Sequence, residues 1–177
     1  MDKLTLAKKI YRVSNIRGNF TLRSGQRATE YFDKYLFEAQ PKLLREIAIQ
    51  LIDSIPKNTE ILAGLEMGGI PIATAMSLQT GISSVFVRKK AKAYGTCKLA
   101  EGGDIKEKNL LIVEDVVTSG GAIIDAVSQL RQLGAKVEQA VCVIDREGLG
   151  QKNLKDIDVE LIPLFSKSYL ESAVSSN

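Results

Sequence analysis

Short apolar runs alternate with amphipathic stretches over most of the chain. The runs are rich in Val, Ile and Leu and lack polar alternation, which is typical of parallel strands buried on both faces. They predict strands at residues 61–65, 84–87, 110–113, 137–144 and 159–162. Helical spacing predicts helices at 69–78 and at 121–133, the second ending before Gly134. Strands that alternate with helices indicate an α/β fold, a parallel twisted sheet flanked by helices.

The first forty residues do not follow this alternation. Their pattern predicts a helix at 4–13, short strands at 20–22 and 30–32, and a polar turn at 24–26 between the strands. A further helix is predicted from Pro41 to near Pro56, and the Ser/Asn-rich segment 172–177 is predicted to be a loose end. We expect residues 1–40 to form a small hood over the end of the sheet where α/β proteins bind ligands. Residues 41–177 would then form the α/β core of a single domain.

Composition excludes several classes of protein. The chain has 177 residues, 45% hydrophobic and 25% charged, which predicts one soluble globular domain with a substantial core. A formal charge of +3 is too small to indicate a nucleic-acid partner. The absence of His excludes Ser-His-Asp triads and His-ligated zinc. The two cysteines, Cys97 and Cys142, indicate a reduced, cytoplasmic protein. No apolar leader or membrane-length apolar run occurs, so we expect neither secretion nor a membrane span.

The most informative segment joins the predicted strand at 110–113 to the predicted helix at 121–133. Two adjacent acids, Glu114 and Asp115, precede a turn made of Val116, Val117, Thr118, Ser119, Gly120, Gly121 and Ala122. Hydroxyls, small side chains and open N–H groups at a helix N-terminus suit a phosphate monoester. Adjacent carboxylates suit a sugar diol or Mg²⁺ better than a triphosphate. The segment therefore predicts a site for a phosphorylated sugar; the alternative is a plain turn with a hydroxyl side chain as N-cap.

Two other loops carry candidate chemistry. Five cationic residues and no acid lie between Arg88 and Lys98, within a stretch that has no periodicity. Such a segment is either a solvated charge run or a lid that neutralises a pyrophosphate leaving group. Met67 and Gly68 follow the predicted strand at 61–65, where a glycine pair exposes N–H groups to an anion or simply makes a turn.

The string from 110 to 122 resembles the motif with which type I phosphoribosyltransferases bind phosphoribosyl diphosphate, PRPP. This resemblance implies that Glu114 and Asp115 hold the ribose hydroxyls, while residues 116–122 surround the 5′-phosphate. It also implies that Met67 and Gly68 contact the pyrophosphate.

Further segments resemble the orotate phosphoribosyltransferases within that family. The stretches 20–25 and 30–33 are similar to the N-terminal signature of those enzymes, and the basic segment from Arg88 to Gly102 is similar to their loop. Arg146 falls where they have an orotate-binding arginine, whose planar fork suits a carboxylate. The resemblance implies an orotate site made of Tyr31, Phe32, Thr118 and Arg146. The residues alone leave two alternatives open. Arg146 could form a surface ion pair, and the rings of Tyr31 and Phe32 could only pack the hood.

The resemblance implies an enzyme that transfers the phosphoribosyl group of PRPP to orotate, giving orotidine 5′-monophosphate and pyrophosphate in pyrimidine biosynthesis. It implies no protein nucleophile, and it assigns catalytic roles to Lys89, Asp115 and Arg88. The PRPP contacts additionally include Arg23, Lys92 and Tyr94. Mg²⁺ is expected to be held through PRPP, with at most water-mediated contact to the acid pair and no direct protein ligand. The resemblance also implies a homodimer in which Lys89 reaches the neighbouring site.

Three positions depart from the pattern of this family. Tyr94 stands where many members have His, Arg23 replaces the more usual Lys, and Met67-Gly68 replaces an aromatic-Lys pair found in some relatives. PRPP binding is still expected, with fewer cations at the pyrophosphate.

Two other functions compete with this interpretation. A phosphoribosyltransferase for a purine base would share the PRPP segment but would not need Arg146 or the hood signature. A PRPP-sensing regulator would share the fold without catalysis, but it usually needs a DNA-binding domain or a strongly basic face. A secondary RNA-binding role stays open, and we expect no nucleic-acid or membrane partner.

Overall fold

The computed structural model describes residues 1–21, 25–91, 95, 98–146 and 148–175. Along them the elements follow in the order α1 (Lys3–Ser14), β1 (Asn15–Thr21), β2 (Arg27–Phe32), α2 (Tyr35–Glu38), α3 (Pro41–Ile52), β3 (Ile61–Leu65), α4 (Gly69–Thr80), β4 (Ser83–Val87), β5 (Ala100–Glu101), β6 (Asn109–Val117), α5 (Gly121–Gln132), β7 (Lys136–Asp145), α6 (Leu149–Lys155), β8 (Glu160–Ser166) and α7 (Lys167–Ser175). Within these residues no helix is long and apolar enough to cross a bilayer.

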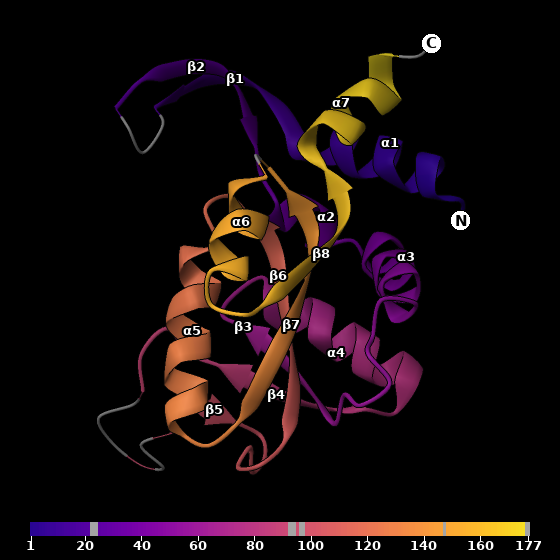
Figure 1. Cartoon of the computed structure of the whole chain (residues 1–177). Helices are drawn as coiled ribbons and strands as arrows, with labels where there is room; N and C mark the ends of the chain where they lie inside the picture. The colour runs from indigo at the N-terminus through magenta and orange to yellow at the C-terminus, as the bar shows by residue number, and fades with distance from the viewer. Residues whose placement is uncertain (22–24, 92–94, 96–97, 147, 176–177) are drawn as a thin grey trace.

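The central sheet has the strand order β5-β4-β3-β6-β7-β8 (Figure 1). Strands β4, β3, β6, β7 and β8 pair in parallel, and the short β5 pairs antiparallel with β4. The chain moves outward in one direction from β3 to β4 and in the other direction from β6 to β8. The boundary between β3 and β6 is therefore a topological switch point, and ligands of open α/β sheets bind beyond the carboxyl ends of the strands there.

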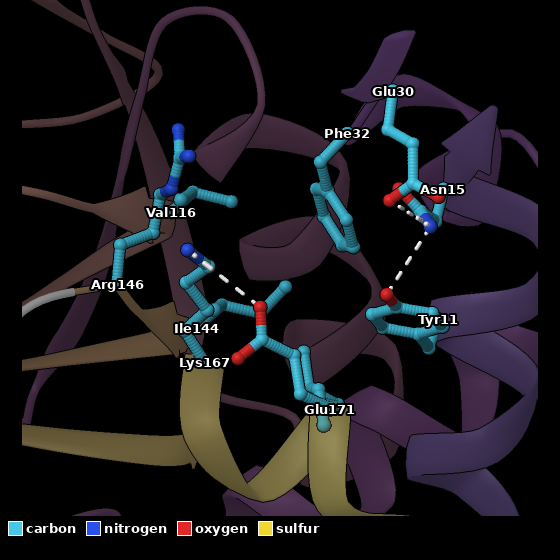
Figure 2. A pocket seen from close by; sticks show the side chains of 10 residues that line it. Tyr11, Asn15, Glu30, Phe32, Val116, Ile144, Arg146, Lys167 and Glu171 are labelled. Atoms are coloured by element: carbon cyan, nitrogen blue, oxygen red, sulfur yellow. Dashed lines mark hydrogen bonds and ion pairs between the residues drawn. The ribbon is translucent and has the colours of Figure 1, made fainter. Parts of the chain in front are cut away.

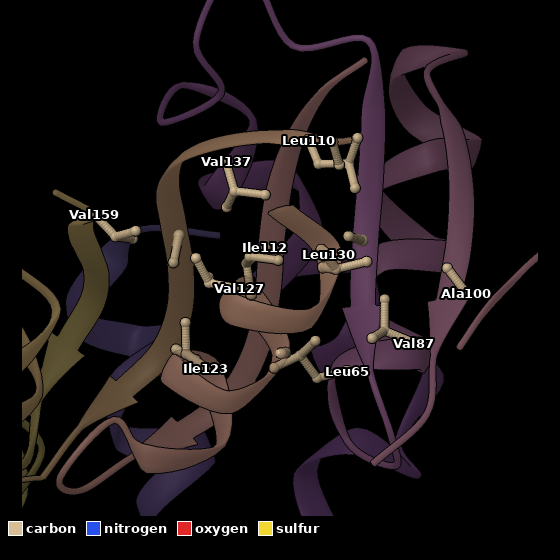
Figure 3. Packing of buried hydrophobic residues seen from close by; sticks show 14 of the residues in the cluster. Leu65, Val87, Ala100, Leu110, Ile112, Ile123, Val127, Leu130, Val137 and Val159 are labelled. Carbon is tan, nitrogen blue, oxygen red and sulfur yellow. The ribbon is translucent and has the colours of Figure 1, made fainter. Parts of the chain in front are cut away.

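Helices cover both faces of the sheet. Figure 1 shows α5 and α6 on one face and α3 and α4 on the other. Figure 3 shows Ile123, Val127 and Leu130 of α5 pointing onto strand residues such as Ile112 and Val137, and all five are buried. Each fully buried side chain of this size contributes about 1.5–3 kcal/mol of hydrophobic stabilisation. This packing holds the N-terminus of α5 rigidly against the end of β6.

The first forty residues divide into two structural parts. Strands β1 and β2 form a separate antiparallel ribbon that projects beyond the sheet (Figure 1). Helix α1 instead packs against α3 and α7, and it buries Leu6, Ala7 and Ile10 in the core on the α3/α4 face. The ribbon, rather than the whole segment, overhangs the carboxyl ends of the strands.

The strands expected at 61–65, 84–87, 110–113, 137–144 and 159–162 are all present, with ends that differ by a few residues. The predicted parallel sheet is confirmed, and the antiparallel edge strand β5, a pair of residues too short to give a hydrophobic pattern, was not predicted. The predicted loose end at 172–177 is wrong as far as Ser175, because α7 continues there and buries Leu170 and Ala173. Helices α2 and α6 were not predicted, since each is very short.

Candidate active site

Four loops that carry candidate residues leave neighbouring strands at the same edge of the sheet. They follow β4, β3, β6 and β7, in that spatial order. Register pairs Leu65 with Val87 and Val117 with Asp145, and β6 and β7 continue past the level at which β3 and β4 end, because Gly64 pairs with Val113. The loops after β3 and β7, which begin about eighty positions apart in the chain, therefore meet near the switch point, where a ligand site is expected.

The turn between β6 and α5 forms a small cavity of about 190 Å³, here called the Ser119 cradle, lined by Glu114 and residues 116–123. Gly120 has a φ of 80°, and a Cβ there would lie 3.4 Å from the Leu154 side chain. Asn153 donates a hydrogen bond to the Ser119 carbonyl oxygen at 2.9 Å, which fixes the turn from α6. In the described part of the chain no side chain caps α5. Its first N–H groups are therefore open to an anion, as the sequence predicts.

A second cavity of about 190 Å³, the Arg146 pocket, lies between the ribbon, the sheet and α7. Figure 2 shows Arg146 and Val116 on one side and Phe32 facing them, with Lys167 and Glu171 of α7 below. The Arg146 backbone N–H donates to the Val117 carbonyl oxygen at 2.8 Å, so the arginine is tied to the start of the cradle. Arg146 is exposed and points its guanidinium at solvent in a pocket that also holds an aromatic ring. This arrangement suits a flat anion.

Polar contacts support both sides of this pocket. The Asp145 side chain accepts from the Gly148 N–H and from Gln151 Nε2, both at 3.2 Å, which anchors the turn that carries Arg146. On the other side, Asn15 Nδ2 donates to Tyr11 Oη at 3.1 Å and to Glu30 Oε2 at 3.2 Å (Figure 2). Burial raises the pKa of Tyr11, and the charges of Glu30 and Glu171 raise it further, so its hydroxyl stays protonated.

The two aromatic residues predicted for the orotate site lie on different faces of β2. Phe32 lines the Arg146 pocket, whereas Tyr31 is 45% exposed and packs against the Phe20 ring, with centroids 5.5 Å apart. Adjacent strand residues point to opposite faces, which explains the division. Thr118 lines the Ser119 cradle rather than the Arg146 pocket.

The loop after β3 is pressed against the acid pair of β6. A Cβ at Gly68 would overlap the Asp115 carboxylate, and a Cβ at Gly69 would overlap the Val113 carbonyl group. Only glycine permits this close approach. Glu66 precedes a cis peptide bond to Met67, and Met67 itself is 63% exposed. The loop therefore stands beside the acids with one face open to solvent.

The basic segment begins beside that loop. The Lys89 N–H donates to Glu66 Oε1 at 2.6 Å, and the Arg88 N–H donates to the Leu99 carbonyl oxygen at 2.9 Å. Arg88, Lys89, Glu66 and Asp125 line a cavity of about 260 Å³, here called the Lys89 hollow. The predicted contacts Arg23, Lys92 and Tyr94 lie outside the described residues.

The three cavities share walls. Val116 lines both the Arg146 pocket and the Ser119 cradle, and Ala122 lines both the cradle and the Lys89 hollow. The order along the sheet edge is thus a cationic pocket with an aromatic ring, a phosphate-sized cradle, and a hollow lined by three cationic residues, Arg88, Lys89 and Lys90. Such a row fits a ring acceptor, a sugar phosphate and a diphosphate side by side.

The acids of β6 belong to a buried cluster that sequence reasoning missed in part. Lys34 Nζ lies 2.6 Å from Asp115 Oδ2, and Glu38, 7% exposed, adjoins the same carboxylate. Burial raises the pKa of Glu114, and the neighbouring Asp115 raises it further. Burial and the Asp115 charge raise the pKa of Glu38 to about 8.

Asp115 behaves differently from these two neighbours. Burial raises its pKa, but contacts with Glu114 and Lys34 lower it by more, and the net pKa lies below its usual value. Of the three acids in this cluster, Asp115 is therefore the one whose ionised form is favoured, and it is paired with the Lys34 ammonium group. Lys34 and Glu38 carry no sequence signal, because each is a single charged residue outside any motif. Lys167 is a further unpredicted cation at the Arg146 pocket.

These donors do not make a self-sufficient metal site. Within the described ranges, no group of three or more Asp, Glu or Cys side chains is placed to hold an ion. The Glu114 side chain at the cradle is a hard oxygen donor of the kind that Mg²⁺ accepts together with waters and phosphate oxygens. The residues therefore fit an ion that a diphosphate brings with it.

Comparison with known proteins agrees with this geometry. The phosphoribosyl transferase domain family matches residues 36–169. An orotate phosphoribosyltransferase from Nocardioides sp. (strain ATCC BAA-499 / JS614) is 52% identical over 169 residues, covering 96% of this chain and 94% of the relative. The Mycobacterium tuberculosis H37Rv orotate phosphoribosyltransferase in complex with Fe(III) dicitrate superposes with a TM-score of 0.86 at 27% identity, covering 96% of this chain and 99% of the other. Its complex with PRPP gives a TM-score of 0.82 at 24% identity, with coverages of 97% and 99%.

Proposed function

The chain belongs to the orotate phosphoribosyltransferases of the phosphoribosyl transferase domain family, and from that premise we propose how its residues carry out the reaction. The reaction transfers the phosphoribosyl group of PRPP to orotate, giving orotidine 5′-monophosphate and pyrophosphate in pyrimidine biosynthesis. It is the reaction of a pentosyltransferase.

One observation carries the assignment of sites to substrates. The backbone N–H of Arg146 is bonded to Val117, so the cationic pocket and the phosphate cradle are fixed to each other through one strand end. In our proposal the 5′-phosphate occupies the Ser119 cradle, and the ribose hydroxyls meet the acid pair, Glu114 and Asp115. The carboxylate of orotate then pairs with Arg146, and its ring lies against Phe32. Arg146 contributes a planar bidentate contact that uracil, which lacks a carboxylate, does not form.

The pyrophosphate half of PRPP is assigned to the Lys89 hollow. Arg88 and Lys89 supply positive charge there, and Glu66, which directly precedes Met67 and Gly68, lines the same space. The new bond forms between a ring nitrogen of orotate and the anomeric carbon of ribose, while the bond from that carbon to the pyrophosphate oxygen breaks and the proton of the ring nitrogen passes to the departing pyrophosphate or to solvent. Cations that stabilise the departing diphosphate act most strongly when negative charge develops on it. No protein nucleophile is required, and alignment of the two substrates supplies much of the rate.

We further propose that Mg²⁺ enters with PRPP, and that Glu114 contacts its hydration shell. When bound, the ion would neutralise charge on the diphosphate. Glu114 and Asp115 hold and orient the ribose in either case. The donor set of hard oxygens, with no three-ligand cluster among the residues that the structure describes, supports this form of binding.

The working unit in our proposal is a homodimer in which Lys89 also serves the neighbouring site. The exposed, strongly basic start of the segment after β4 supports this assignment. A reducing compartment, the cytoplasm, is proposed as its location, and the buried free thiol of Cys142 is consistent with that.

Pyrophosphate release from Mg²⁺-PRPP tests the proposal, with orotate, uracil, adenine and hypoxanthine as acceptors in parallel. We expect release with orotate only. Arg45→Ala, which removes an exposed arginine of α3, is the matched control for Arg146→Ala and should retain the activity of the parent. If the parent protein prefers adenine or hypoxanthine, the proposed acceptor is wrong and the substrate is a purine base. Binding of PRPP without pyrophosphate release in the presence of any of these bases would indicate a sensing protein.

A further inference from the structure

Lys34 connects the hood to the acid pair through an ion pair. Its ammonium nitrogen lies 2.6 Å from Asp115 Oδ2, between residues 81 positions apart in the sequence. The Asp115 side chain is fully buried, whereas that of Lys34 is 33% exposed and lies over the Tyr35 ring. The pair is thus reached from the solvent side only through the lysine.

Asp115 is also the residue that fixes the entrance to the cradle. Its Oδ1 accepts the backbone N–H of Val116, and Val116 lines both the Ser119 cradle and the Arg146 pocket. Gly68 closes a further side, because a Cβ there would overlap the carboxylate. One carboxylate oxygen therefore holds the strand end at the PRPP site, and the other is held by Lys34.

Asp115 needs a cation in this position. Glu38 Oε1, which has no hydrogen-bond partner among the described residues, adjoins the same carboxylate, and Glu114 follows it directly in the strand. A buried ionised group that loses its only opposite charge is strongly destabilised. Without Lys34 the carboxylate would turn toward water, and its hold on the Val116 N–H would be lost.

We propose that Lys34 is a positioning residue for PRPP, which acts by orienting Asp115 and thereby Val116 and the Ser119 cradle. This inference rests on the proposed function and goes beyond it, since Lys34 need not touch either substrate. The residues before Lys34, on the acceptor side, are held by a separate hydrogen bond. Phe32, two residues before Lys34, lines the Arg146 pocket, and the Asp33 N–H between them donates to the Ser14 carbonyl oxygen at 2.8 Å.

Kinetics and PRPP binding of Lys34→Met, which keeps length and removes charge, test the proposal. We expect the dissociation constant of Mg²⁺-PRPP, measured by titration calorimetry, and the KM for PRPP to rise about 10- to 100-fold, the range of a charged hydrogen bond. The KM for orotate should change less than threefold, and Lys34→Arg should recover most of the PRPP affinity. A purely structural role would not separate the two substrates. Lys42→Met, an exposed lysine of α3, is the control.

The Asp115→Asn background shows whether Lys34 acts through Asp115. There, Lys34→Met should weaken PRPP binding less than threefold, because the charge that it orients is gone. An unchanged or tighter PRPP affinity of Lys34→Met, or an equal loss in both backgrounds, would overturn the inference. If Lys34→Met does not fold, Lys34→Gln takes its place, because it retains a donor for Asp115 and should weaken PRPP binding about fivefold. An unchanged PRPP affinity of Lys34→Gln would also overturn the inference. A parent protein that neither binds PRPP nor uses orotate refutes the proposed function instead.

Discussion

Replacing Glu38 by Gln tests the protonation of the buried cluster. Glu38 faces Asp115, Lys34 and Asp33, and its pKa is raised from 4.5 to about 8 by burial first and by the Asp115 charge second. Gln resembles the protonated carboxyl in shape, so Glu38→Gln should leave the contacts of the neutral form in place. The parent and the variant therefore differ in one property, the ability to ionise at residue 38.

The sign of the effect follows from proton linkage. The folded protein holds the Glu38 proton up to about pH 8, whereas the unfolded chain releases it near pH 4.5. Stability from this group is therefore complete below pH 4.5 and is lost as the pH rises through 8. A fully desolvated group with these two pKa values would lose about 5 kcal/mol. Screening by water reduces this loss of stability, and we expect the ionisation of Glu38 to cost about 2 kcal/mol of unfolding free energy.

Urea denaturation of the parent and Glu38→Gln at pH 5.5, 7 and 8.5 measures this difference. The free energy of unfolding of the variant should exceed that of the parent by an amount that grows toward pH 8.5, reaching about 2 kcal/mol. Glu138→Gln, at an exposed position of β7, should run parallel to the parent. If Glu38→Gln also runs parallel, Glu38 is ionised at neutral pH and the charge assignment of the cluster is wrong.

Four further outcomes are expected. Arg146→Ala should lower kcat/KM for orotate by a factor that corresponds to about 2–5 kcal/mol of lost transition-state stabilisation, with PRPP affinity nearly unchanged. Arg146→Lys should recover only part of this loss. If Arg146→Ala uses orotate as well as the parent does, the proposed contact with the carboxylate is wrong. Lys89→Ala mixed with Asp115→Asn should regain activity in hybrid dimers, and absence of rescue after verified subunit exchange would place Lys89 in its own site. Gly68→Ala should lose about 1–3 kcal/mol of stability and most PRPP affinity, whereas Gly103→Ala, with a nearest contact at 3.7 Å, should lose neither. Mg²⁺-PRPP at a hundred times its dissociation constant should stabilise the fold by about 2.7 kcal/mol, and melting curves that superimpose with and without it would contradict PRPP binding.

The sequence predicts most of the fold because its strands are short, continuous apolar runs with helices between them. The segment from Glu114 to Ala122 can also be recognised from the sequence, since one continuous stretch of chain contains both the acids and the cradle. Elements whose structure depends on distant contacts cannot be predicted in this way. Helix α7 is rich in Ser and forms because Leu170 and Ala173 pack into the core. Strand β5 exists only through its pairing with β4.

The site divides in the same way. A motif within one loop can be recognised because its residues are neighbours in sequence, but Lys34 and Glu38 acquire their meaning from Asp115, 81 and 77 positions away. Three carboxyl groups around the single ammonium group of Lys34 cost stability. A turn with no role in ligand binding would not require this arrangement. The arrangement is understandable if the Asp115 carboxylate has to be fixed from both ends, by Lys34 on one oxygen and by the Val116 N–H on the other. Such a carboxylate keeps a single orientation before substrate arrives, so little reorganisation is left to PRPP binding.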